Sequence, residues 1–172
     1  RYEVFEQIGF FDEVLVRNQD DDFNFRVTQA GGKIFYCHEI SIRYYVRGNM
    51  KNLWKQFQQY GYWKVFVNRK HKAVTTMRQL VPPAFVLFLI TVPFTFLIHP
   101  WLGLSATAAI SFYTLIGLLV AFRTADHKSE VPELWLVFPV LHISYGWGYL
   151  RGIIEFLILR KQPSETSKQL SR

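Results

Sequence analysis

Three consecutive aspartates, Asp20 to Asp22, stand where the chain is best equipped for acid–base chemistry, within "NQDDDFNFRVTQAGG" (residues 18–32). Three interpretations are open: a solvated helix start, a cation site, or the acid/base centre of an enzyme. Negative charge at a helix start complements the helix dipole, by about 0.3–1 kcal/mol per residue. An EF-hand is excluded, because its acidic residues alternate and lead into a central glycine. Consecutive helical residues point about 100° apart, so at most two of the three can act on one small target.

A second group of residues that could bind a ligand lies in "QFQQYGYWK" (residues 56–64), which holds Gln59, Tyr62 and Trp63. The face of a tryptophan suits the CH-rich face of a sugar ring, and a glutamine can hydrogen-bond to sugar hydroxyls. The alternative for Trp63 is an anchor at a membrane interface. His38 and His142 lack partners at metal-ligand spacing, so ordinary packing or a hydrogen bond is expected for both.

The elements that must position these residues are mixed in type. Residues 20–30 have helical spacing, and Asp22 and Arg26 are four apart, where opposite charges can pair. Gly31 and Gly32 are typical of a helix stop. "KIFYC" (33–37) and "ISIRYYV" (40–46) are rich in β-branched and aromatic residues and predict strands. Residues 52–67 predict a basic amphipathic helix suited to a membrane interface.

The second half of the chain is strongly apolar. Residues 80–98 and 101–122 contain no charge, and either segment is long enough to cross a hydrocarbon core of about 30 Å. His99 and Pro100 leave room only for a tight turn, which predicts a helical hairpin. Residues 134–150 form a third apolar segment. Small residues recur every four positions at Ser144, Gly148 and Gly152, a pattern that permits close helix approach. A third packed span is the first choice for this segment, and a re-entrant or interfacial helix is the alternative.

The basic residues predict the orientation. The chain carries a net charge of +7, yet it has no Asp or Glu between Ile40 and Ala125. The basic run from Lys64 to Arg78 precedes the first apolar segment and should stay cytoplasmic. There it is expected to meet anionic lipid headgroups rather than nucleic acid. A third full span would carry Arg160 and Lys161 outside, against the same rule, so the C-terminal topology stays open.

The order of these motifs carries a resemblance. "FFDE", "RNQDDDFNFR", a Gly-Gly pair, "QFQQYGYWK" and apolar helices together resemble the C-terminal half of a membrane-bound family 2 glycosyltransferase, and most of all the exopolysaccharide enzymes of the succinoglycan-biosynthesis type. The implied fold class is the α/β C-terminal part of an incomplete GT-A domain, followed by an α-helical membrane region of two or three helices. Residues 1–48 would belong to the GT-A domain, 49–78 to an interfacial helix and basic linker, 79–160 to the membrane region, and 161–172 to a polar tail.

The resemblance also nominates site residues. It implies that Asp20 is the catalytic base of an inverting transferase, with Asp21 the fallback and Asp22 a further acidic position of the motif. Gln59 and Trp63 match an acceptor-side motif in which Tyr62 replaces the usual arginine.

The remaining expectations come from the same resemblance. The implied cofactor is Mg²⁺ or Mn²⁺, with ligands on an N-terminal half that is expected to be missing, so these residues alone should be inactive. The implied partners are a nucleotide-sugar donor, a lipid-linked or polysaccharide acceptor, and membrane lipids, without nucleic acid. The implied location is the inner (cytoplasmic) membrane, as a multi-pass protein with a cytoplasmic catalytic part.

Two rival hypotheses stand beside the resemblance. One is a non-enzymatic assembly or export subunit whose aspartates cap a helix, and the other is a soluble RNA-binding module.

Overall fold

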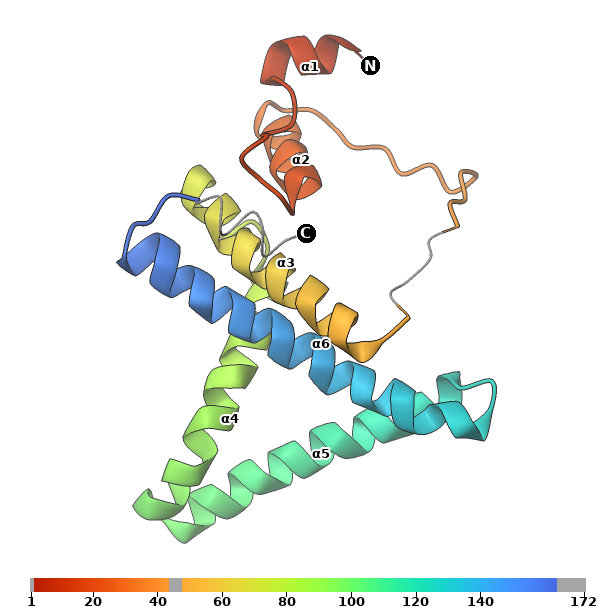
Figure 1. Ribbon diagram of the computed structural model, residues 1–172, viewed down its shortest axis with the longest axis vertical. Helices are drawn as coiled ribbons and strands as arrows, with labels where there is room; N and C mark the ends of the chain where they lie inside the picture. The colour runs from red at the N-terminus through yellow and green to blue at the C-terminus, as the bar shows by residue number, and fades with distance from the viewer. Residues whose placement is uncertain (1, 44–47, 164–172) are drawn as a thin grey trace.

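The computed structural model describes residues 2–43 and 48–163 of the chain. Within them the regular structure is helical (Figure 1). The elements are α1 (Tyr2–Ile8), α2 (Gln19–Gln29), α3 (Met50–His71), η1 (Met77–Leu80), α4 (Val81–Ile98), α5 (Pro100–Thr124), η2 (Lys128–Glu130), α6 (Val131–Gly152) and η3 (Ile153–Ile158). The last of these is a π-helix that continues α6.

The predicted α/β fold class is wrong for this chain, because the described residues contain no strand. Residues 33–37 and 40–43 are irregular, and residues 44–46 of the second predicted strand lie outside the described residues. Side chains that were expected to pack on a sheet are exposed, with 88% of Phe35 and 84% of Ile42 open to solvent. Strand-type residues fit a pleated, half-buried surface, but the ladder also needs a partner strand, and none is available among the described elements.

The predicted helix at the aspartate run is confirmed as α2. Asp20, Asp21 and Asp22 lie in its first turn. At the other end, Gly31 adopts a left-handed φ of 78° and donates its N–H to the carbonyl of Thr28 at 3.1 Å. Glycine takes this conformation without steric cost, which explains why the helix ends there.

The most extensive helix–helix contact joins α3 to α6, and the two helices lie side by side in Figure 1. Their backbones touch at glycines: a Cβ on Gly61 would overlap the carbonyl oxygen of Tyr145, and one on Gly148 would overlap that of Gln58. A Cβ on Gly152 would lie 2.8 Å from the carbonyl oxygen of Tyr62. The predicted small-residue stripe therefore does permit close approach, and the partner helix is α3.

The core of the molecule forms where α3 meets the end of α6. Its buried residues are Leu15, Tyr62, Trp63, Val65, Val67, Tyr149 and Phe156. Aromatic rings dominate this cluster, and the rings of Tyr62 and Phe156 lie 4.7 Å apart. Because most of these residues come from α3, the position of this helix decides where the neighbouring elements can pack.

The predicted helical hairpin is confirmed by α4 and α5, which turn at His99. Two candidate membrane spans, Met77–Ile98 and Pro100–Thr124, have mean hydropathies of 2.2 and 1.9, and only 11% of an apolar 18-residue window in each is buried. A core helix of a soluble protein would be mostly buried, whereas Leu97 and Trp101 are both largely exposed here. Exposed apolar flanks of this length favour contact with lipid.

Two further hydrogen bonds hold α6 and the segment that follows it. The Tyr113 hydroxyl of α5 and Nδ1 of His142 lie 2.7 Å apart, an ordinary hydrogen bond as expected for this histidine. Figure 1 shows α6 running along α3 rather than along the α4–α5 hairpin. Beyond η3, an Nη1 of Arg69 donates to the carbonyl of Lys161 at 2.9 Å. The end of the described chain therefore returns to the basic end of α3.

The glycine contact between α3 and α6 predicts a difference between two identical substitutions. Gly148→Ala should lower the thermal unfolding temperature, because its Cβ meets backbone atoms that no rotamer change can move, and overpacking costs about 1–3 kcal/mol. Gly117→Ala on α5 is the matched control, because its Cβ would meet Trp135 Cδ1 at an ordinary 3.5 Å. It should be neutral or stabilising, since alanine favours helix by up to about 1 kcal/mol. Equal melting temperatures for the two variants would contradict this packing.

Candidate active site

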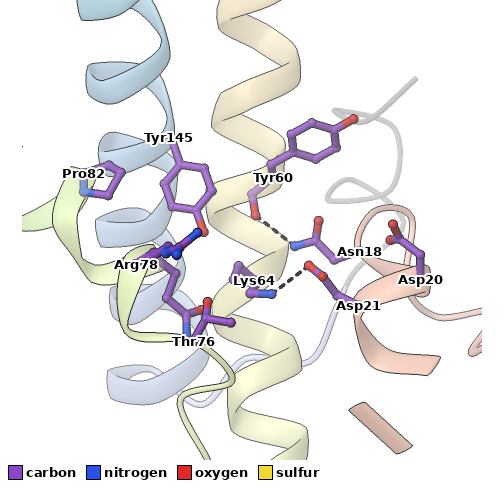
Figure 2. Close-up of a pocket in the computed structure, with 10 residues that line it drawn as sticks. Asn18, Asp20, Asp21, Tyr60, Lys64, Thr76, Arg78, Pro82 and Tyr145 are labelled. Atoms are coloured by element: carbon purple, nitrogen blue, oxygen red, sulfur yellow. Dashed lines mark hydrogen bonds and ion pairs between the residues drawn. The ribbon is translucent and has the colours of Figure 1, made fainter. Parts of the chain in front are cut away.

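A cavity of about 560 Å³ lies between the start of α2, the middle of α3, the segment leading into α4, and α6. It is lined by Asn18, Asp20, Asp21, Tyr60, Lys64, Thr76, Arg78, Gln79, Pro82 and Tyr145. Figure 2 shows the residues of α2 on one side of α3, with Arg78, Pro82 and Tyr145 on the other. Two of the three predicted aspartates are therefore on the wall of a cavity of ordinary ligand-binding size.

Polar contacts fix the start of α2 on α3. The Asn18 side-chain amide donates to the carbonyl of Tyr60 at 3.0 Å, and Nζ of Lys64 pairs with Asp21 at 2.7 Å (Figure 2). Just before α2, Nε of Arg17 donates to Oε1 of Gln59 at 3.2 Å. These bonds join residues far apart in sequence, so they set where the aspartate run lies relative to the cavity.

Asp20 differs from its two neighbours. Its side chain is exposed and lines the cavity, and no described residue forms an ion pair or hydrogen bond with its carboxylate. Asp21 also lines the cavity, but its carboxylate is bound by Lys64. Of the three aspartates, Asp20 has the carboxylate that lines the cavity without a partner among the described residues.

Asp22 points the other way, into the protein. Its side chain is completely buried and pairs with Nε of Arg26 at 3.1 Å, Nζ of Lys70 at 2.9 Å and Nε2 of His71 at 2.8 Å. Lys70 also binds Asp12 at 2.7 Å, which gives this cluster contacts from three segments of the chain. The third aspartate therefore joins α2 to the end of α3 instead of facing the cavity.

The charged groups around Asp22 shift one another's pKa values. Burial alone would raise the pKa of Asp22, but hydrogen bonds from Lys70 and His71 and the nearby positive charges outweigh it, and the pKa is lowered. The pKa of Asp12 is lowered by the same balance, with burial opposed by Lys70 and the Val14 N–H. Burial would lower the pKa of Lys70, yet its bonds to Asp12 and Asp22 raise it. All three groups are therefore held in their charged forms.

The structure places the predicted acceptor-side residues inside the fold. Trp63 is 0% exposed and packs against Phe156, so its ring faces are covered by protein rather than open to a sugar. The hydroxyl of Tyr62 donates to Oε2 of Glu155 at 2.6 Å, and Gln59 is buried and receives the bond from Arg17. None of the three lines the cavity, and their contact with an acceptor stays a prediction.

A divalent cation finds no ready site in the described part of the chain. Residues 2–43 and 48–163 contain no group of three or more His, Cys, Asp or Glu side chains that could hold an ion. Asp20 and Asp21 alone do not make such a group, because Lys64 occupies the second carboxylate. The predicted Mg²⁺ or Mn²⁺ therefore stays a prediction, with its ligands elsewhere.

Lys64, Arg78 and Tyr145 were missed as site residues by sequence reasoning. The sequence pattern assigns Lys64 and Arg78 to the basic run that orients the hairpin and meets lipid headgroups. The available signal was the position of Arg78, which is the last charge before the first apolar segment. For Tyr145 no short-range signal exists, since its place in the cavity depends on how α6 packs on α3.

Known proteins include relatives of this chain. The chain is 24% identical over 160 residues to the succinoglycan biosynthesis protein ExoA of Rhizobium meliloti (strain 1021), covering 91% of this chain and 46% of that protein. It is 26% identical over 149 residues to the dolichyl N-acetyl-alpha-D-glucosaminyl phosphate 3-beta-D-2,3-diacetamido-2,3-dideoxy-beta-D-glucuronosyltransferase of Methanococcus voltae, covering 84% of this chain and 42% of that enzyme.

The chain is related to glycosyltransferases. The predicted resemblance to enzymes of exopolysaccharide and glycan synthesis is thereby confirmed, and with it the predicted enzyme class at the level of relationship. The chain spans less than half the length of either relative. No family model matches the chain, and no solved structure is significantly similar to it.

The burial of Asp22 predicts unequal effects from two neighbouring isosteric substitutions. Asp22→Asn should destabilise the full-length protein by about 1–3 kcal/mol, because it removes the charge of the buried carboxylate that Arg26, Lys70 and His71 bind. Asp21→Asn is the matched control and should cost less than about 1 kcal/mol, because its carboxylate is nearly half exposed and has one partner. Thermal unfolding of both variants checks this. A similar loss in both would show that Asp22 does not hold α2 in place.

The lowered pKa values predict the effect of acid. A carboxylate whose pKa is lowered by folding contributes stability above its unfolded pKa, and this contribution is lost as the pH falls through the folded value. As the pH falls below about 3.8, the reference value for Asp12 and Asp22, the hydrogen-exchange protection factors of α2, corrected for the intrinsic exchange rate at each pH, should fall. In Asp22→Asn these protection factors should already be low at neutral pH and change less with acid. An equal acid response in the wild type and this variant would contradict the assignment.

Proposed function

We propose that this chain forms the acceptor-side part of a membrane-bound, family 2-type inverting glycosyltransferase. The enzyme would move a sugar from a nucleotide-diphosphate sugar to a lipid-linked acceptor, in the synthesis of an exopolysaccharide or cell-envelope glycan. The observation that carries the proposal is the open carboxylate of Asp20 on the wall of the cavity, next to the start of a candidate membrane span. The relationship to glycosyltransferases supplies the reaction class.

The choice of a lipid-linked acceptor rests on two observations. The name of the Methanococcus voltae relative describes transfer to a dolichyl-linked sugar phosphate. In this chain the cavity is bounded by Pro82, at the second residue of α4, and by Arg78 and Gln79 just before that helix. An acceptor whose lipid lies in the membrane would therefore have its sugar at the level of the cavity.

The chemistry assigned to Asp20 is general base catalysis. The acceptor hydroxyl gives its proton to the Asp20 carboxylate as its oxygen attacks the anomeric carbon of the donor, and the nucleoside diphosphate leaves from the opposite face. The base must come within about 2.6–3.2 Å of that hydroxyl. Asp21 is less suited, because accepting a proton would break its ion pair with Lys64. Asp22 is enclosed by its partners and has no access to the cavity.

The membrane arrangement follows from the packing of α6. We place the α4–α5 hairpin across the inner (cytoplasmic) membrane as two spans, with the cavity on the cytoplasmic side. Since α6 runs along α3 and the carbonyl of Lys161 binds Arg69, α6 is assigned to the interface rather than to a third span. This assignment keeps Arg160 and Lys161 on the same side as the basic end of α3 and removes the conflict with the positive-inside rule.

Substitution of two adjacent aspartates tests the proposed base. In the full-length enzyme, Asp20→Asn should reduce kcat for sugar transfer by at least about 100-fold, the usual contribution of a general base. The affinity for the nucleotide sugar should change little. The measurement is incorporation of labelled sugar by membranes carrying the enzyme, over several nucleotide sugars.

Asp21→Asn is the matched control for this experiment, since it changes the same functional group one residue along. It should retain most of the activity. If Asp21→Asn abolishes transfer and Asp20→Asn does not, the base is Asp21. If both variants transfer at the wild-type rate, the cavity is not the catalytic site.

A further inference from the structure

The wall of the cavity that faces away from α2 has chemistry of its own. Arg78 lies there on η1, is exposed, and forms no ion pair with any described carboxylate. In Figure 2 its guanidinium group lies across α3 from Asp20 and Asp21. One wall has the positive charge of Arg78, and the other has Asp20 together with the Asp21–Lys64 ion pair, which leaves a net negative charge. The cavity therefore has two electrostatically different ends.

A second, independent feature lies next to Arg78. Gln79 also lines the cavity and is only 5% exposed. Its Oε1 accepts a hydrogen bond from Nδ2 of Asn68 at 3.0 Å, but its Nε2 has no hydrogen-bond partner within the described chain. Buried donors in proteins are nearly always paired. This one is covered from solvent, so it would meet an acceptor group on a ligand when the Gln79 side chain turns toward the cavity.

The location narrows the ligand further. Both residues belong to η1, the first turn of the candidate span Met77–Ile98, and Pro82 continues the same wall into α4. The adjoining Val81 is largely exposed and apolar. A ligand bound here would have an anionic group at the membrane surface and an apolar part beside the helix that enters the lipid.

We propose that Arg78 and Gln79 bind the phosphate of the lipid-linked acceptor and hold its sugar toward Asp20. Guanidinium groups bind phosphate oxygens with two parallel hydrogen bonds, and the unpaired Nε2–H of Gln79 would supply a further donor once its side chain turns toward the cavity. The inference rests on the proposed function and adds the residues that position the acceptor. The net negative charge of Asp20 on the opposite wall disfavours the more highly charged nucleoside diphosphate as the occupant of this wall.

Direct binding tests the proposal without any turnover. The full-length enzyme would be placed in nanodiscs of neutral phosphatidylcholine and titrated with farnesyl phosphate, with farnesol and inorganic phosphate as comparison probes. Farnesyl phosphate should bind at least 10-fold more tightly than either. Arg78→Gln should weaken this binding by at least 10-fold, and Gln79→Leu should weaken it measurably.

The matched control is Arg123→Gln. Arg123 is also an exposed arginine near the end of a candidate span, but it does not line the cavity. This variant should bind farnesyl phosphate like the wild type. Arg78→Lys should bind farnesyl phosphate more tightly than Arg78→Gln but less tightly than the wild type, because an ammonium group cannot form the paired hydrogen bonds of a guanidinium.

Four results would overturn the proposal. Two are equal losses of affinity in Arg78→Gln and Arg123→Gln, and equal binding of farnesol and farnesyl phosphate. The other two are displacement of bound farnesyl phosphate by phosphatidylglycerol as readily as by farnesyl phosphate itself, and an Arg78→Gln variant that loses only the binding of nucleoside diphosphate. The outcome is separable from that of the proposed catalysis. Asp20→Asn should bind farnesyl phosphate normally, so failure of the base assignment would leave this site intact. If the enzyme does not bind farnesyl phosphate but its activity still depends on Asp20, the phosphate site is wrong and the assignment of the base stands.

Discussion

The direct backbone contact between α3 and α6 is the constraint on which the rest of the structure depends. The glycines at 61 and 148 let the two helices approach until main-chain atoms touch, and this fixes the rotation of α3 about its own axis. Every element of the cavity then takes its place from α3. Tyr60 and Lys64 hold the start of α2, while Asn68 binds Gln79 on the opposite wall. A small rotation of α3 would therefore move both walls of the cavity at once.

The aspartate run shows how helix geometry divides one charged motif among three tasks. Successive side chains leave a helix about 100° apart. Asp20 thus faces the cavity, Asp21 reaches Lys64, and Asp22 enters the buried cluster with Lys70 and His71. Asp22 therefore has a structural task, while the catalytic task of Asp20 stays a proposal. The charge of Asp22 keeps α2 in place so that Asp20 can be positioned.

Local features of the fold were predictable from the sequence and distant pairings were not. Helix α2, the α4–α5 turn at His99, and the contact surface at Gly148 each follow from a pattern within a few residues. The strands expected at residues 33–37 and 40–46 failed because a strand depends on a partner that no local pattern reveals. In the same way Trp63 is covered by Phe156, 93 positions further along, so spacing alone could not tell whether its ring would face a sugar, a lipid or the core.

The opposed charges of the cavity have a directional consequence. A molecule that is anionic at one end and neutral at the other fits such a field in a single orientation, because reversing it would bring like charges together. With its phosphate beside Arg78, an acceptor would offer the hydroxyls farthest from its lipid to the reacting carboxylate. Glycan growth would then extend outward from the membrane attachment, and the polarity of the product would be decided before any bond is made.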